Sequence, residues 1–258
     1  MVNLKNYNVV LKYFVLILTF IFCISCHQQK TYITKIEGKE IGITSDYKDV
    51  AVIEDFIKPY RDKIDADLNI VLAYAPETLD KTGQWQTPIG NFFADVMVQK
   101  GNKIFNLREK KSIDIGLFNS GGIRTIIPKG NITIRTAYEI MPFENNLVVI
   151  ALKGNQIQEM INYIISEKKP HPLNGLTFTI SKNNEATSIL VQGKPLEIDT
   201  TYYVATNDYL ANGGDNMIFF KKGSQKFDLD YKLRNVLIDY FKEVDTVKAP
   251  TNKRINVE

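Results

Sequence analysis

The segment Asn-Ser-Gly-Gly-Ile-Arg at positions 119–124 contains residue types well suited to binding an anion. It directly follows the run 113–118, in which isoleucine and leucine alternate with other residues as in a strand. Two glycines after a strand let the backbone turn tightly and let another group approach closely. Arg124 would then present a planar, charged guanidinium to a phosphate or carboxylate. Considered alone, the segment is more simply a β-turn followed by a surface arginine, so its function depends on what accompanies it.

A second glycine-rich segment occupies positions 207–215 and also follows an expected strand. Tyr209 offers a flat aromatic face on what we expect to be a loop. Gly213 and Gly214 precede Asp215, whose carboxylate can accept hydrogen bonds from two hydroxyl groups at once. The combination suits a ligand that has both a flat ring and paired hydroxyls.

A third segment, at positions 141–146, places an aromatic residue in a polar stretch. Phe143 follows Pro142, and the fixed backbone angle of proline favours a ring held in one place. An exposed phenylalanine on a loop is unusual. The alternative is that Phe143 packs into the core, as most phenylalanines do.

Together these groups match the needs of a nucleotide or nucleoside. Two aromatic faces can sandwich a planar base, which contributes about 1–3 kcal/mol per stacked base. A carboxylate can hold the ribose hydroxyls, as acidic residues do in dinucleotide sites, and an arginine can hold a phosphate. Two asparagines can read a base edge. The residues expected to bind this ligand are Asn119, Gly122, Arg124, Phe143, Asn145, Tyr209, Gly213, Gly214 and Asp215.

The elements that must position these residues can be read from apolar spacing. Helices and strands are intermixed and one hairpin is expected, which predicts an α+β (mixed α/β) domain with mixed sheets packed against helices. Expected helices cover 46–63, 89–98, 154–165 and 231–244, with a short one that stops near 142. Expected strands cover 68–73, 113–118, 147–152, 176–180, 189–191, 196–198 and 202–206.

The composition is that of an ordinary globular protein. The chain has 258 residues, of which 44% are hydrophobic and 24% are charged. Its net charge is only +3, and lysines and arginines are scattered along the sequence. This balance gives no case for nucleic acid as a partner.

The first 26 residues stand apart from the rest of the chain. The run 13–24 carries no charge and follows two lysines, as in a secretory signal peptide. It ends near Cys26, which resembles the cysteine of the bacterial lipoprotein box and would be lipidated; a plain signal peptide or an uncleaved anchor are the alternatives. We therefore expect a signal peptide over 1–25, a lipidated cysteine and tether over 26–45, and one domain over 46–258. The protein would lie in a bacterial cell envelope as a periplasmic or outer-membrane lipoprotein.

The three ligand-binding segments occur in this order, at this kind of spacing, in the C-terminal domain of bacterial and animal 5′-nucleotidases. The chain resembles that family from about residue 67 to 257. In the family this domain binds the nucleoside part. The resemblance implies that Phe143 and Tyr209 sandwich the base, that Asp215 binds the ribose hydroxyls and that Arg124 contacts the phosphate or ribose side. The resemblance also implies that Asn119 and Asn145 contact the base.

One position departs from the family pattern. Relatives usually carry a second substrate arginine seven residues before Gly90, where this chain has Gly83. Loss of one hydrogen bond to a charged group would lower nucleotide affinity by roughly one to two decades. Trp85 or Lys81 could compensate for it.

In the same family a separate N-terminal metallophosphoesterase domain holds two metal ions and performs hydrolysis. Before position 46 the sequence is only leader and tether, and the chain has two histidines. We therefore expect no catalytic residue, metal or other cofactor here; a separate metallophosphoesterase subunit would carry the two divalent metals. The first hypothesis is a recognition domain acting with that subunit. The second is a lipid-anchored, non-catalytic nucleoside-binding protein, and the third is a remnant that binds nothing.

Overall fold

The computed structural model describes residues 4–24, 32–45 and 47–258, which divide into two units, 1–51 and 52–258. In the first unit, α1 (Leu4–Ile24) is a helix, and residues 32–44 form neither helix nor strand. Within the described ranges, no helix is both long and apolar enough to cross a membrane. Cys26, the expected lipid acceptor, lies outside the described residues.

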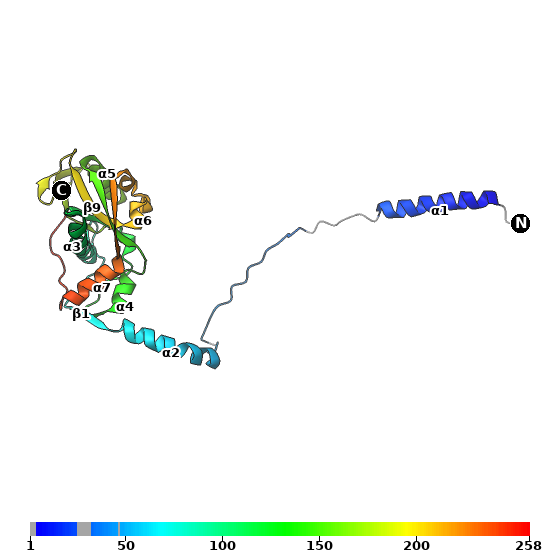
Figure 1. The fold of residues 1–258 in the computed structure, drawn as a ribbon, viewed down its shortest axis with the longest axis horizontal. Coiled ribbons are helices and arrows are strands. Elements are labelled where there is room, and N and C mark those ends of the chain that lie inside the picture. Colours follow the sequence, from blue (N-terminus) through cyan, green and yellow to red (C-terminus); the bar gives the residue numbers. More distant parts are fainter. Residues whose placement is uncertain (1–3, 25–31, 46) are drawn as a thin grey trace. The chain divides into compact units, whose positions relative to one another are not determined.

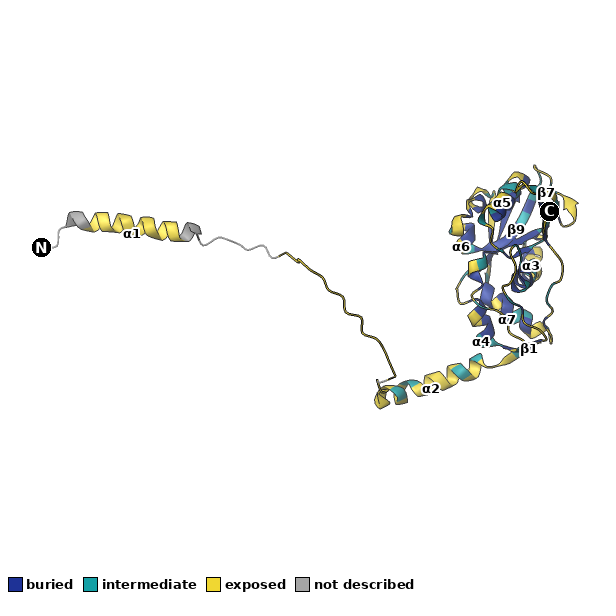
Figure 2. Cartoon of the chain, turned by 180° about the vertical axis from the view of Figure 1, so that it is seen from behind, coloured by how far each residue is buried: buried dark blue, intermediate teal, exposed yellow. Residues whose placement is uncertain are grey.

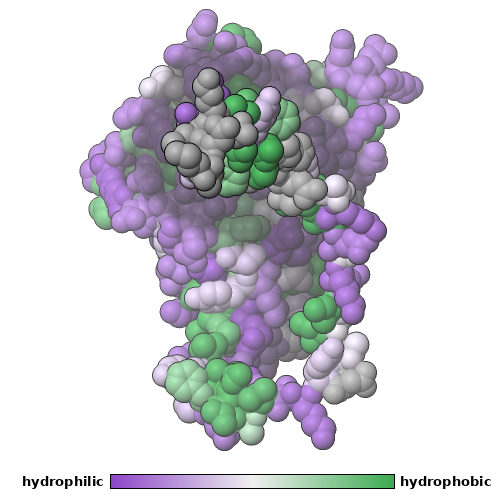
Figure 3. Space-filling view, turned by 90° about the vertical axis from the view of Figure 1, so that its right-hand side faces the viewer, coloured by the Kyte–Doolittle hydropathy of each residue, from purple (hydrophilic) through white to green (hydrophobic). Residues whose placement is uncertain are grey.

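The second unit begins with a helix that has no buried residue. This helix, α2 (Ala51–Leu68), starts later and ends later than the 46–63 expected from the sequence. Ile64 and Leu68 continue its apolar spacing, which explains the later end. The strand expected at 68–73 is displaced in consequence and becomes β1 (Val71–Ala75). Figure 2 shows α2 as largely exposed, and the face in Figure 3 is mostly hydrophilic with separate apolar patches.

A five-stranded mixed sheet forms the centre of this unit, which confirms the expected mixed α/β fold. Its order is β10-β4-β9-β2-β5, and only β2 and β9 pair in parallel. β4 is buried from Leu147 to Leu152 because it has a partner strand on both sides and helices nearby. The bounds are β2 (Ile115–Leu117), β4 (Asn146–Lys153), β5 (Leu173–Asn174), β9 (Thr201–Asn207) and β10 (Gln225–Lys232).

Amphipathic helices pack on this sheet, as Figures 1 and 2 show. The longest, α3 (Pro88–Glu109), begins at Thr87, whose hydroxyl accepts a hydrogen bond from Gly90 N at 3.0 Å. It runs beyond the expected 89–98 because Phe105 extends its buried face. The others are α5 (Gly154–Glu167) and α7 (Leu233–Glu243), while α4 (Ile134–Ile140) packs against α7.

Two smaller sheets complete the unit. One pairs β1 with β3 (Gly130–Thr133), and the other has the order β11-β6-β7-β8. The hairpin expected here is present, but its second strand covers 194–195 and not 196–198; beyond it, Leu196 N still donates to the Ile189 carbonyl at 3.2 Å. The bounds are β6 (Leu176–Ile180), β7 (Ala186–Val191), β8 (Lys194–Pro195) and β11 (Ile255–Val257).

The order of the central strands brings three distant segments to one edge of the sheet. β2 and β9 are parallel neighbours, so the segments that follow them, 119–124 and 207–215, leave the sheet at the same edge. β4 is antiparallel to β9, with Leu147 opposite Asn207, so the segment that precedes β4 arrives at this edge too. Ligands of open α/β sheets commonly bind at such a position.

Candidate functional site

The three segments enclose a cavity of about 370 Å³ at this edge. Its volume falls within the range usual for small-molecule sites. Seven of the nine residues expected from the sequence line it, together with Gly121, which was not among the expected residues. The lining residues are Asn119, Gly121, Gly122, Arg124, Phe143, Asn145, Tyr209 and Asp215.

The Asp215 carboxylate is held by two neutral donors from different segments. Its Oδ1 accepts a hydrogen bond from the Tyr209 hydroxyl at 2.8 Å, and its Oδ2 accepts one from Asn119 Nδ2 at 2.6 Å. Asn119 is only 7% exposed, and within the described residues its Oδ1 has no hydrogen-bond partner. The hydrogen bond to Asp215 raises the pKa of Tyr209. The carboxylate is thus oriented before any ligand arrives, and a buried acceptor stands beside it.

The backbone around Asp215 takes a conformation that few residues adopt. Asp215 has φ +51° and Gly213 has φ +86°, both in the left-handed region. A Cβ on Gly214 would overlap the Tyr209 ring, so only glycine lets that ring lie against the turn. The Tyr163 hydroxyl donates to the Asp215 carbonyl at 2.6 Å. The two glycines therefore do not line the cavity but shape the turn that presents the carboxylate.

Tyr209 lies on a helical turn, and the loop expected there is wrong. The turn is α6 (Asp208–Ala211), which begins at Asn207, whose Oδ1 accepts from Leu210 N at 2.7 Å. This cap ends β9 and starts the helix in one step. Tyr209 remains 48% exposed, so its ring is available to a ligand.

Phe143 is 41% exposed and lines the cavity, so the alternative that it packs into the core is wrong. Its segment is held by residues at the end of β10 and the start of α7. Arg234 donates to the Pro142 carbonyl at 3.3 Å and forms an ion pair with Glu144. Lys232 Nζ donates to the Glu144 carbonyl at 2.6 Å. These contacts fix the backbone on both sides of an exposed ring.

Arg124 joins the first segment to the third. Its backbone N donates to the Ile140 carbonyl at 2.9 Å, and its Nη1 donates to the Gly121 carbonyl at 3.3 Å. The guanidinium carbon lies 5.8 Å from the centre of the Phe143 ring, a cation–π distance. A guanidinium has five N–H donors, so most remain for a ligand.

Gly83 does not belong to this cavity. Its φ is +131°, and a Cβ there would overlap the Gln86 carbonyl oxygen. It borders a different hollow together with Trp85. On this backbone an arginine at position 83 has no room, and Trp85 is not placed to replace one.

His171 supports the first segment, a role that the sequence did not indicate. It is 3% exposed, and its Nδ1 accepts a hydrogen bond from Ser120 N at 3.3 Å. Burial lowers the pKa of His171 to about 4, so the ring is neutral at pH 7. A neutral ring keeps Nδ1 free to accept this bond, whereas protonation would abolish it.

Acidification should therefore weaken the fold before its carboxylates titrate. The unfolded chain protonates His171 near pH 6.5 while the folded chain does so near pH 4, so the unfolded state binds more protons between these values. We expect the free energy of unfolding to fall by about 2 kcal/mol from pH 7.5 to 5. Urea unfolding at both pH values measures it. His171→Gln keeps an acceptor but cannot titrate, and an equal pH dependence in this variant and in the wild type would contradict the assignment.

Among the described residues, no group of three or more His, Cys, Asp or Glu side chains is arranged to hold a metal ion. The cavity lining contains one carboxylate, that of Asp215. What the arrangement offers is recognition of a polar, partly aromatic ligand by stacking, hydrogen bonds and one guanidinium.

Comparisons with known proteins point to one family. The family model of the 5′-nucleotidase C-terminal domain matches residues 71–222. The trifunctional nucleotide phosphoesterase protein YfkN of Bacillus subtilis is 30% identical over 179 residues, 64% of this chain and 12% of that protein. The 5′-nucleotidase of Vibrio vulnificus is 25% identical over 191 residues, 70% of this chain and 32% of that protein.

A solved structure agrees with the sequence relatives. The 5′-nucleotidase precursor from Thermus thermophilus matches with a TM-score of 0.68 and 28% identity, over 80% of this chain and 43% of that one. This chain therefore spans less than half the length of each of these relatives. The cavity-bearing segments 119–124, 141–146 and 207–215 all lie within the matched range 71–222.

Proposed function

Because this chain belongs to the family of 5′-nucleotidase C-terminal domains, a nucleotide-processing family, we propose that it recognises a nucleotide or nucleoside within a 5′-nucleotidase-type hydrolase system for nucleotide catabolism. One observation carries the proposal. Three segments far apart in sequence bring two half-exposed rings, an arginine, two asparagines and an oriented carboxylate to one cavity. Few ligand classes use all of these groups at once.

Each group has a defined part in the proposed complex. Phe143 and Tyr209 stack on the two faces of the base. Asn145 donates or accepts at the base edge, and Asn119 Oδ1, which has no hydrogen-bond partner among the described residues, accepts there. Asp215 accepts hydrogen bonds from the ribose hydroxyls. Arg124 lies on the phosphate side.

Hydrolysis would be performed by a separate metallophosphatase subunit that carries two divalent metals. This part of the proposal rests on the resemblance to a family in which a separate metallophosphoesterase domain performs the hydrolysis, and nucleotidases named as such are more than twice as long as the part that this chain matches. In this arrangement the chain binds and orients the nucleotide, and the partner cleaves the phosphate ester.

The second candidate is a lipid-anchored protein that binds nucleosides without catalysis. The observation in its favour is that Arg124 is the only cation among the eight lining residues, and that position 83 has no room for another. A nucleoside carries no phosphate and would need no second cation.

Calorimetry with AMP and with adenosine tests the proposal. A marked preference for AMP supports the recognition domain of a nucleotidase. Equal affinity supports the nucleoside-binding protein instead. No binding of either ligand by the folded wild type would mean that the cavity is a remnant and would refute both. If AMP is preferred, addition of the chain to a secreted metallophosphatase from the same bacterium should accelerate AMP hydrolysis.

We also propose that the chain is anchored in a bacterial cell envelope through lipidated Cys26. The sequence of the leader supports this proposal. Mass spectrometry of the N-terminal peptide from the membrane fraction checks this proposal. An unmodified Cys26, or a leader that is still attached, would refute it.

A further inference from the structure

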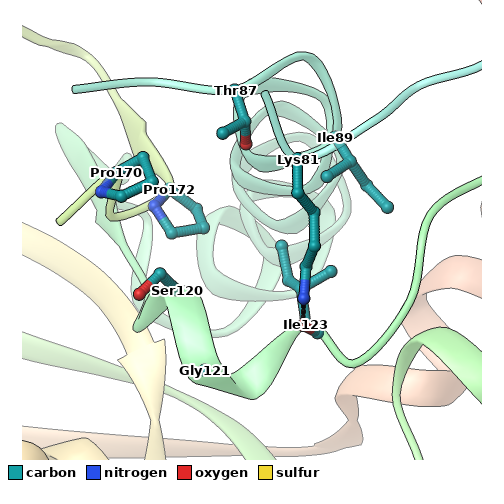
Figure 4. Close-up of a pocket in the computed structure, with 8 residues that line it drawn as sticks. All are labelled: Lys81, Thr87, Ile89, Ser120, Gly121, Ile123, Pro170 and Pro172. Atoms are coloured by element: carbon teal, nitrogen blue, oxygen red, sulfur yellow. Dashed lines mark hydrogen bonds between the residues drawn. The ribbon is translucent and has the colours of Figure 1, made fainter. Parts of the chain in front are cut away.

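A second cavity, of about 250 Å³, adjoins the first and shares Gly121 with it. Figure 4 shows its walls. Lys81 and Ile123 lie on one side, and Ser120 and two prolines lie on the other, with Thr87 at the start of α3 above them. A Cβ on Gly121 would meet nothing closer than 3.9 Å, so the backbone between the two cavities is bare.

The distinctive group in this cavity is Lys81. Its side chain extends to the carbonyl of Ile123, to which its Nζ donates. Arg124, the next residue, donates to the carbonyl of Gly121. Two cationic side chains therefore bind the carbonyl groups of one three-residue segment, each from its own cavity.

No acidic side chain among the described residues neutralises either cation. In the described part of the chain, Lys81 and Arg124 form no ion pair, although eleven others are present. Partial desolvation, and secondly the charge of Arg124, lower the pKa of Lys81, which reflects how close the two cations lie. Like charges held together without a counter-ion cost free energy, and a bound anion would relieve that cost.

Neutral donors are available beside the lysine. Within the described residues the Ser120 hydroxyl makes no hydrogen bond. The Thr87 hydroxyl accepts from Gly90 N at 3.0 Å, which leaves its own proton free to donate. A phosphate needs several donors, and cationic and hydroxyl groups commonly supply them.

We propose that the second cavity is an anion subsite in which Lys81, together with Arg124, holds the phosphate of a nucleotide whose base and ribose occupy the first cavity. This inference rests on the proposed function and makes it more specific, since it assigns a phosphorylated ligand. Gly121 allows the ligand to pass from one cavity to the other because it has no side chain.

Calorimetry on the full chain with AMP and adenosine tests the subsite. Lys81→Gln should weaken AMP binding about tenfold or more and leave adenosine binding within about twofold, since only AMP loses a charged partner. Lys81→Arg should retain AMP binding. Lys194→Gln, at an exposed lysine on the β7–β8 hairpin, is the matched control and should leave both affinities unchanged.

Failure of this inference can be told apart from failure of the proposed function. Unchanged AMP affinity in Lys81→Gln overturns the subsite but leaves a ligand-binding site. An equal loss of AMP and adenosine affinity also overturns it, because Lys81 would then act only by holding the 121–123 backbone. If the wild type binds neither ligand, the proposed function itself fails.

Discussion

Replacing Asp215 with asparagine is expected to lower the affinity for adenosine about 100-fold. The carboxylate is oriented by Tyr209 at 2.8 Å and by Asn119 at 2.6 Å, so it can accept from both ribose hydroxyls without rearrangement. Asparagine keeps one acceptor oxygen but carries no charge. One hydrogen bond to a charged group, which contributes about 1.5–3 kcal/mol, is lost and the other becomes a weaker neutral one, which together correspond to about two decades in affinity. Calorimetry with adenosine measures the loss.

Asparagine is a more informative replacement than alanine because of the backbone conformation at position 215. Asp215 has φ +51°, a conformation that asparagine tolerates and alanine adopts at a cost of about 1–2 kcal/mol. Asp215→Asn should therefore unfold at nearly the wild-type temperature, so the loss of binding can be ascribed to the charge. Asp55→Asn, on exposed α2, provides the matched control. Adenosine affinity of Asp215→Asn within about twofold of the wild type would rule out this role for the carboxylate.

Removal of the Phe143 ring should have the second largest effect. We expect Phe143→Ala to weaken adenosine and AMP binding about 10- to 100-fold alike, since a stacked base contributes about 1–3 kcal/mol. The ring is 41% exposed, so little core packing is lost and the stability should change slightly. Titration of both ligands against the purified variant measures this.

Two variants make the test of Phe143 specific. Phe56→Ala removes an exposed ring of α2, outside the cavity, and should leave binding unchanged. Tyr209→Phe keeps a stacking face but loses the hydroxyl bonded to Asp215, so its loss should be smaller than that of Phe143→Ala. If Phe143→Ala binds both ligands as the wild type does, the base does not stack on this ring.

Much of the secondary structure can be predicted from apolar spacing, but the ends of the elements cannot. The helix at α5 and the strand at β6 are close to expectation because their apolar faces are unbroken. β10 is absent from the expected strands, although Phe227, Leu229 and Tyr231 alternate with polar residues as a half-buried strand requires. β11 offers no such signal, since three residues are too few to show an alternation and their partner β6 lies far away in the sequence.

Residue types alone predict what the candidate site could bind. Aromatic rings, a carboxylate and a guanidinium are read directly from the sequence, and their chemistry does not depend on the fold. The two glycines before Asp215 also predict a positive φ in this turn. Residue types do not show which glycines line the cavity. Gly121 lines it, whereas Gly213 and Gly214 shape the turn before Asp215.

By itself, then, the sequence determined the family resemblance and the mixed fold class, and it predicted a chemical kind of ligand. The tertiary structure decided that three segments meet at one sheet edge, that Asn119 bonds to a carboxylate 96 residues away and that Lys81 stands beside Arg124. The physical reason is the range of the interactions. Periodicity and turn chemistry act over a few neighbouring residues, whereas strand order depends on hydrogen bonds and burial between segments that only the folded chain brings together.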